Sequence, residues 1–202
     1  MAGLNKKEVM VGTLDQTDVI GAALWGEEGA TLPTIETWDA PLVSPAYVGL
    51  GYLVEDGFTM SFGISVEGLK EHNLGVIRNI ITEFDGTVTI TMLQTNATNM
   101  GVMLGQSNVT TAGATAEHGS RFMAAFGPEL PKPGVLAIKL KDEDRKAIVL
   151  LPHAQVKEYA EVEVTATGAV GWEVTFSALV DEYGKGIYIL FDDGEVISGG
   201  GE

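Results

Sequence analysis

Short segments in which polar and apolar residues alternate are the feature that most constrains the fold. Residues 87–93 (Thr-Val-Thr-Ile-Thr-Met-Leu) alternate polar and apolar residues, 135–141 is read as a second alternating segment, and 161–165 alternates strictly. A period of two places alternate side chains on opposite faces of a β-strand. Further strands are expected at 76–84, 145–151, 170–179 and 187–191. Many short strands with little helix predict an all-β, antiparallel sandwich or barrel.

Turn signals separate these strands. Asp85-Gly86 is among the strongest short hairpin signals, so strands 76–84 and 87–93 are expected to pair through it. Within 87–93 the threonines should share one face, and Val88, Ile90 and Met92 the other. The chain holds 26 glycines in 202 residues, which agrees with numerous tight turns. Other turns are expected at 142–144, 167–168 and 183–186.

One short helix is predicted between the two groups of strands. Thr95 or Asn96 can cap its start, apolar residues at helical spacing occupy Ala97 to Leu104, and Gly105 ends it. About eight residues are too few for an isolated helix. We therefore expect this helix to pack on a sheet.

Charge and composition exclude several classes of function. The formal net charge is −16, and Lys and Arg form no cluster of the kind that binds phosphates. Without cysteine there can be no disulfide framework, thiolate metal site or cysteine nucleophile. No run of about 18 apolar residues predicts a membrane span, and no apolar segment after the first residues predicts a secretory signal.

No motif predicts catalysis, cofactor binding or a metal site. His72, His118 and His153 lie far apart in the sequence, and none has a second ligand-type residue at helical spacing. The acidic segment 142–144 lacks the glycine and the closing glutamate of a calcium loop. No phosphate-binding glycine loop and no nucleophile elbow occur. From the residues alone, the chain is an acidic all-β domain with long arms.

Those arms are longer than a minimal sandwich needs. We expect one domain over residues 1–202, with an N-terminal arm at about 1–20, a long loop at about 26–48 and a Gly-rich acidic tail at about 193–202. Such segments are expected to become ordered on assembly.

Several motifs carry a resemblance to a known family. Residues 21–34 include Leu-Trp-Gly-Glu-Glu-Gly-Ala-Thr-Leu-Pro-Thr, and residues 50–59 read Leu-Gly-Tyr-Leu-Val-Glu-Asp-Gly-Phe-Thr. With 84–96, 141–156 and 188–194 they resemble, in order, the major tail proteins of long-tailed, non-contractile bacteriophages, especially those of actinobacterial hosts. One departure is that Leu69-Lys70 leads into residues 71–75, where the family often has Trp-Gly-Gly.

The resemblance implies a structural virion protein and no enzyme. Members form hexameric rings in which each subunit contributes a sheet to a ring-wide β-barrel, and the rings stack into a hollow tube that conducts DNA. Partners would be further copies of the chain and the tail initiator, terminator and tape-measure proteins. The protein would be made in the host cytoplasm and reside in the virion tail, without a membrane partner, and DNA would pass without specific binding.

Two sets of residues are expected to serve that role. Polar strand faces supply the candidates for the tube lumen: Glu83, Thr87, Thr89, Thr91, Glu161, Glu163 and Thr165. The alternative is that these faces are outer surface. Large side chains near the loop supply the candidates for contacts between subunits: Trp25, Leu32, Trp38, Tyr47 and Tyr52. The alternative for these is packing within one subunit.

Other functions stay open at this point. The first alternative is the tube subunit of a contractile tail or of a type VI-like injection machine, which would share the fold and have a sheath around the tube. A monomeric β-sandwich binding module or hydrolase is a second alternative, and it predicts a pocket with clustered carboxylates of perturbed acidity.

Overall fold

The computed structural model describes residues 9–17 and 20–196. The remaining parts of the expected N-terminal arm and C-terminal tail, residues 1–8, 18–19 and 197–202, lie outside the described residues. The elements are β1 (Thr13–Leu14), β2 (Ala23–Glu27), β3 (Tyr47–Gly49), β4 (Leu53–Glu71), β5 (Gly75–Met92), α1 (Ala97–Leu104), the 3-10 turn η2 (Gln106–Asn108), β6 (Val109–Ala112), β7 (Arg121–Ala124), β8 (Gly134–Asp142), β9 (Arg145–Tyr159), β10 (Trp172–Leu179) and β11 (Tyr188–Asp192).

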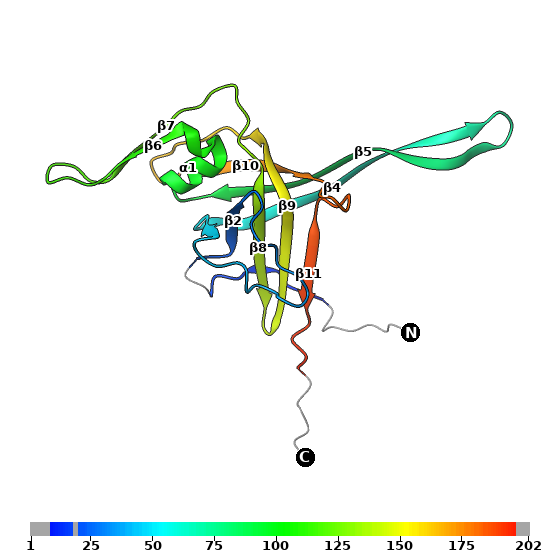
Figure 1. The fold of residues 1–202 in the computed structure, drawn as a ribbon, viewed down its shortest axis with the longest axis horizontal. Helices are drawn as coiled ribbons and strands as arrows, with labels where there is room; N and C mark the ends of the chain where they lie inside the picture. Colours follow the sequence, from blue (N-terminus) through cyan, green and yellow to red (C-terminus); the bar gives the residue numbers. More distant parts are fainter. Residues whose placement is uncertain (1–8, 18–19, 197–202) are drawn as a thin grey trace, which may run out of the picture.

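A single antiparallel sheet of nine strands dominates the structure, which confirms the all-β prediction. Its order is β3-β2-β8-β9-β10-β5-β4, with β1 on β8 and β11 on β9, while β6 and β7 form a separate hairpin. The long strand β9 pairs with β11 through its first half and with β10 through its second half. Pairing between β9 and β10 therefore joins two parts of the sheet. In Figure 1, β8 and β9 are drawn vertically, and β10, β5 and β4 run across them.

Strands β2 and β8 and the first half of β9 are largely buried on both faces. Their sequences are nearly continuous apolar runs, such as residues 22–25, 135–138 and 147–151. The alternation predicted for 135–141 is therefore wrong, because both faces of β8 are buried. One face packs with β5, β10 and α1 in the main core. The other face is covered by the segment between β2 and β3, which contributes Leu42, and by Tyr47 at the start of β3; both belong to a second apolar cluster. Most of the long loop expected at 26–48 thus lies on the subunit's own sheet.

Trp25 and Phe176 lie at the centre of the main core. Their ring centroids are 5.4 Å apart. The indole ring lies against the backbone of Gly134, where a Cβ atom would come within 2.3 Å of the ring. This close approach requires glycine at the start of β8. The large side chains of β2 and β10 can then meet across the core.

Truncating Phe176 should therefore be one of the most destabilising single changes. Phe176→Ala leaves a cavity beside Trp25, and we expect the free energy of unfolding to fall by about 3–5 kcal/mol. Urea unfolding followed by tryptophan fluorescence measures the change. Phe191→Ala, at a half-exposed aromatic residue of β11, is the matched control and should cost no more than about 0.5 kcal/mol. Equal losses for the two variants would contradict this assignment of the core.

The helix begins and ends where the sequence predicts. The Asn96 side chain accepts a hydrogen bond from the Asn99 N–H at 2.8 Å and so caps α1, and Gly105 follows the last helical residue with a φ of 95°. Asn99 is buried and donates from Nδ2 to the carbonyl oxygens of Gln94 (2.8 Å) and Leu50 (3.1 Å). These bonds fix the helix to the segments on either side of the β4–β5 pair.

Two further strand predictions are wrong. Asp85-Gly86 is not a turn, because β5 runs without interruption from Gly75 to Met92 and pairs along its length with β4. The turn of this hairpin lies between Glu71 and Gly75 instead. Residues 161–165 form no strand and lie in the irregular segment that connects β9 to β10. The turn predicted at 142–144 is confirmed, since Asp142 pairs with Arg145 across it.

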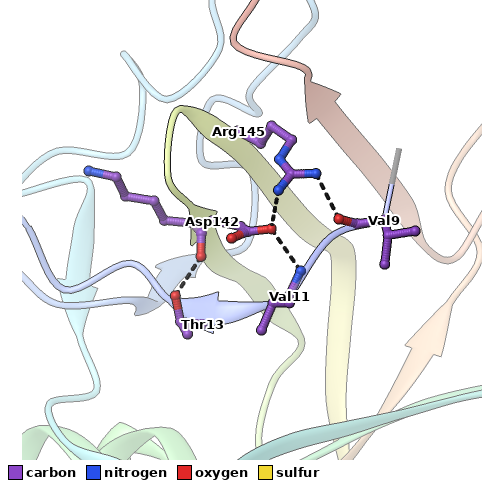
Figure 2. Close-up of polar contacts among 6 residues, drawn as sticks. Val9, Val11, Thr13, Asp142 and Arg145 are labelled. Atoms are coloured by element: carbon purple, nitrogen blue, oxygen red, sulfur yellow. Dashed lines mark hydrogen bonds and ion pairs between the residues drawn. The ribbon is translucent and has the colours of Figure 1, made fainter. Parts of the chain in front are cut away.

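A polar cluster fixes the chain around β1 to the tip of the β8–β9 hairpin (Figure 2). Arg145 donates from Nη2 to the Asp142 carboxylate at 2.6 Å and from Nη1 to the Val9 carbonyl oxygen at 2.7 Å. The same Asp142 carboxylate accepts the Val11 N–H at 2.8 Å. The Thr13 hydroxyl donates to the Lys141 carbonyl oxygen at 2.5 Å. The part of the expected N-terminal arm from Val9 to Leu14 is therefore attached to the subunit.

Candidate assembly surfaces

The paired strands β4 and β5 extend far beyond the rest of the subunit (Figure 1). They comprise 19 and 18 residues, whereas strands in globular proteins usually have about 3–10. We call the part from Phe62 to Phe84 the projecting hairpin. Strand pairs need a covered face to be stable on their own, so the two faces of this hairpin are informative.

One face of the projecting hairpin is apolar and continues the main core. Directly opposed residues of two antiparallel strands share a face. The buried Val88 is opposite Met60, and the next three pairs on that face are Phe62 with Gly86, Ile64 with Phe84, and Val66 with Ile81. The apolar side chains of this face beyond the core are 39–65 % exposed. We call this set the apolar face: Phe62, Ile64, Val66, Ile81 and Phe84.

The opposite face of the same strands carries hydroxyl groups. Thr87 and Thr89 of β5 are opposite Ser61 and Thr59 of β4, and on the other side they are opposite Ser177 and Thr175 of β10. The hydroxyls of Thr89 and Thr175 lie 2.8 Å apart in a hydrogen bond. All these side chains are at least partly exposed. We call this set the hydroxyl face: Thr59, Ser61, Thr87, Thr89, Thr91, Thr175 and Ser177.

The charged groups beside the hydroxyl face are of both signs. Lys157 of β9 donates to both carboxylate oxygens of Asp85 at 2.6 Å. Glu173 accepts the Thr91 hydroxyl at 3.2 Å, and Glu83 accepts the Ser65 hydroxyl at 3.4 Å. The side chains of Asp85 and Lys157 are 45 % and 42 % exposed, so their ion pair contributes little stability. The ion pair does reduce the positive charge beside the hydroxyl face, because the Lys157 ammonium group already has the Asp85 carboxylate as its partner.

Phe84 joins the projecting hairpin to the body of the subunit. Its ring lies over Gly86 and Gly186, where Cβ atoms would approach ring atoms to 2.9 Å and 2.7 Å. Only glycine leaves room for the ring at these two positions. The base of the hairpin is thereby held by packing, which orients its apolar face.

The structure places the predicted lumen residues in two separate regions. Glu83, Thr87, Thr89 and Thr91 are all in β5 and point to the same side of the sheet as the hydroxyl face. The predicted alternation of 87–93 is confirmed, since Val88, Ile90 and Met92 are buried on the other side. Glu161, Glu163 and Thr165 are exposed in the irregular segment after β9 and are not brought into this sheet.

The predicted contact residues divide by burial. Trp25 and Tyr47 are buried within the subunit, and the Tyr47 hydroxyl donates to the Thr31 carbonyl oxygen at 2.9 Å. Burial raises the pKa of Tyr47 to about 12. Leu32 and Trp38 pack partly against the second apolar cluster. Tyr52 is exposed and is available to a neighbouring molecule.

Sequence reasoning missed the apolar face, although a signal for it exists. Residues 58–67 alternate apolar and polar residues over ten positions, which is the pattern of a strand. The hairpin predicted through Asp85-Gly86 pairs 76–84 with 87–93, which leaves residues 58–67 without a partner. The correct turn is marked by Gly75, whose φ is 83°.

Over the described residues, no group of three or more His, Cys, Asp or Glu side chains is arranged to hold a metal ion. In the same part of the chain, no helix has the length and apolarity to cross a membrane.

A family model described as "Phage tail tube protein" matches residues 2–196. No curated protein matches the chain.

Proposed function

Because the chain belongs to the phage tail tube protein family, whose members are structural proteins of the virion tail, we propose that it assembles as stacked hexameric rings that conduct DNA to the host. The observation that carries this proposal is the division of the β4–β5 pair into a hydroxyl face and an apolar face. A subunit of a hollow tube needs one surface for the bore and another for its neighbours.

We propose that the hydroxyl face lines the tube lumen. Neutral hydroxyls can exchange hydrogen bonds with water, and they place no fixed cation against the DNA phosphates. Clustered lysine and arginine would instead bind the duplex through release of its counterions. The lysine beside this face is paired with Asp85, and the chain as a whole carries a net charge of −16. A wall of this kind lets a polyanion slide without strong attachment.

The apolar face supplies the reason for assembly. Its five large side chains are exposed in a single subunit, and contiguous apolar surface of this kind marks an interaction site. Strand β4 is also an edge of the nine-stranded sheet, and a free edge pairs readily with another strand. In a ring, a neighbouring subunit would cover the apolar face and complete the edge, which closes the sheet into a barrel.

The alternatives place different demands on the molecule. A tube subunit of a contractile or type VI-like machine would use the same two faces and differ by a sheath around the tube. A monomeric binding module would need a ligand pocket with a few convergent polar groups. The exposed apolar face supports assembly over a monomer, because a monomer would leave it in contact with water.

Electron microscopy of purified protein tests the proposal. We expect concentrated protein, alone or with the tail initiator complex, to form rings and hollow tubes with six subunits per ring. Analytical ultracentrifugation of the same sample measures the proportion assembled. Only monomers at high concentration, even with the initiator present, would contradict the proposal, and tubes purified from virions with an enclosing sheath would favour the contractile alternative.

A further inference from the structure

The subunit contains a cavity that the sheet and the hairpin do not explain. It measures about 580 Å³ and lies between the end of β2, the C-terminal end of α1 and residues 129–133. We call it the helix-end cavity. Its lining is mixed: Trp25, Val102, Leu104 and Leu130 supply the apolar part, and Gln106, Ser107 and Asn108 are among the polar residues.

The tip of the projecting hairpin has the opposite character, since it is convex and exposed. Its turn carries Leu74, which is 79 % exposed, between Leu69 and Ile77, which are 50 % and 58 % exposed. None of these apolar side chains is covered within the subunit, and each can supply apolar contact to a receiving surface. Exposed apolar side chains gathered in this way suit the tip to contact with another molecule.

Charge also distinguishes the two surfaces. Glu27, Glu28 and Glu129 lie around the helix-end cavity together with one cation, Lys132. The hairpin tip presents Lys70 and Arg78 on either side of its turn, together with the acidic Glu67 and Glu71. The two cations of the tip can therefore meet carboxylates at the rim of the cavity, and such complementarity fixes the register of an interface more than its affinity.

The positions of these surfaces exclude a contact within one subunit. Figure 1 shows the hairpin tip at one end of the longest axis and α1, with β6 and β7, toward the other end. Two complementary surfaces on opposite ends of one molecule produce head-to-tail contacts. Such heterologous contacts close into rings when the rotation between copies permits it.

We propose that the helix-end cavity receives the tip of the projecting hairpin, residues 69–78, of a second copy of this chain. Leu74 would contact the apolar part of the cavity lining, and Lys70 and Arg78 would face the acidic rim. The inference rests on the proposed tube function and adds to it the specific partner surface on the neighbouring subunit. It assigns a role to the cavity and to α1, neither of which the lumen requires.

Cross-linking can test this contact cleanly, because the chain contains no cysteine. Leu74→Cys at the hairpin tip and Ser107→Cys at the cavity are made as separate variants, mixed, assembled and treated with a short bis-maleimide. Ile77→Cys provides a second tip position in case Leu74→Cys impairs assembly. The matched control mixes Leu74→Cys with Asp193→Cys, which lies beyond β11 at an exposed position.

We expect covalent dimers in the Leu74–Ser107 mixture at least about tenfold above the control, because docking raises the effective concentration of the two thiols to the order of 1 mM. Tubes that form without this excess, at both tip positions, would overturn the docking inference and leave the tube function intact. A strong cross-link between subunits that form no tubes would support the docking and contradict the tube. If the mixture formed no tubes and gave no excess of cross-linked dimers, the docking inference and the tube function would both be contradicted.

Discussion

Aspartate at Ile64 and Val66 should abolish assembly while the subunit stays folded. Both side chains belong to the apolar face and are more than half exposed, so the change costs the isolated subunit little. In the proposed ring these positions are covered, and an unpaired buried carboxylate is strongly unfavourable. We expect no tubes by electron microscopy and a melting temperature close to that of the wild type.

The same strand offers a matched control on its other face. Thr59→Asp with Ser61→Asp adds the same charge to β4, but on the hydroxyl face, which the proposal leaves open to water. This variant should still form tubes. Normal tubes from the Ile64→Asp, Val66→Asp variant would show that the apolar face is not an interface between subunits.

Lysine on the hydroxyl face should block DNA passage without preventing assembly. Thr87→Lys with Thr89→Lys adds two cations per subunit to the proposed lumen wall, repeated along the tube. Each phosphate contact releases counterions, so DNA retention should be strong at low salt and fall steeply as salt rises. We expect tubes of normal appearance and genome delivery reduced by at least about tenfold, measured as infectivity of virions that carry the variant.

Two control variants separate charge from packing in this experiment. Thr87→Ser with Thr89→Ser retains the hydroxyls and should leave delivery unchanged. Ile35→Lys adds a cation in the loop before β3, at an 89 % exposed position, and should also leave delivery unchanged. If the lysines at 87 and 89 had no effect on infectivity, the hydroxyl face would not line the lumen.

Much of the fold could be predicted because its signals are local. Asn96 caps the start of α1 and Gly105 ends it, so each limit depends on a residue next to the helix. The alternation in 87–93 likewise indicates that Val88, Ile90 and Met92 are buried. The β8–β9 turn carries a run of acidic residues between two apolar strands. Such features depend on neighbours in the sequence, and sequence patterns report them directly.

The remaining features depend on contacts between distant segments. Asp85-Gly86 has the composition of a turn, yet β4 and β10 flank β5 on both sides and hold it extended through this point. Gly86 is needed there because the Phe84 ring lies against it, together with Gly186 from a segment 100 positions later. For 161–165 the alternation is present, but no described strand pairs with it. Composition alone cannot distinguish a glycine that turns the chain from one that makes room for a ring.

The two-sided character of the projecting hairpin limits how its length can change. Each residue added to or removed from one strand would move every later side chain to the opposite face. The hairpin already contains two register irregularities, at Ser65/Val66 and at Leu69/Lys70, and beyond the first of them Val66 and Ile81 still lie on the apolar side. Insertions and deletions in related tube subunits should therefore occur in pairs of residues per strand, or together with a β-bulge that restores the parity.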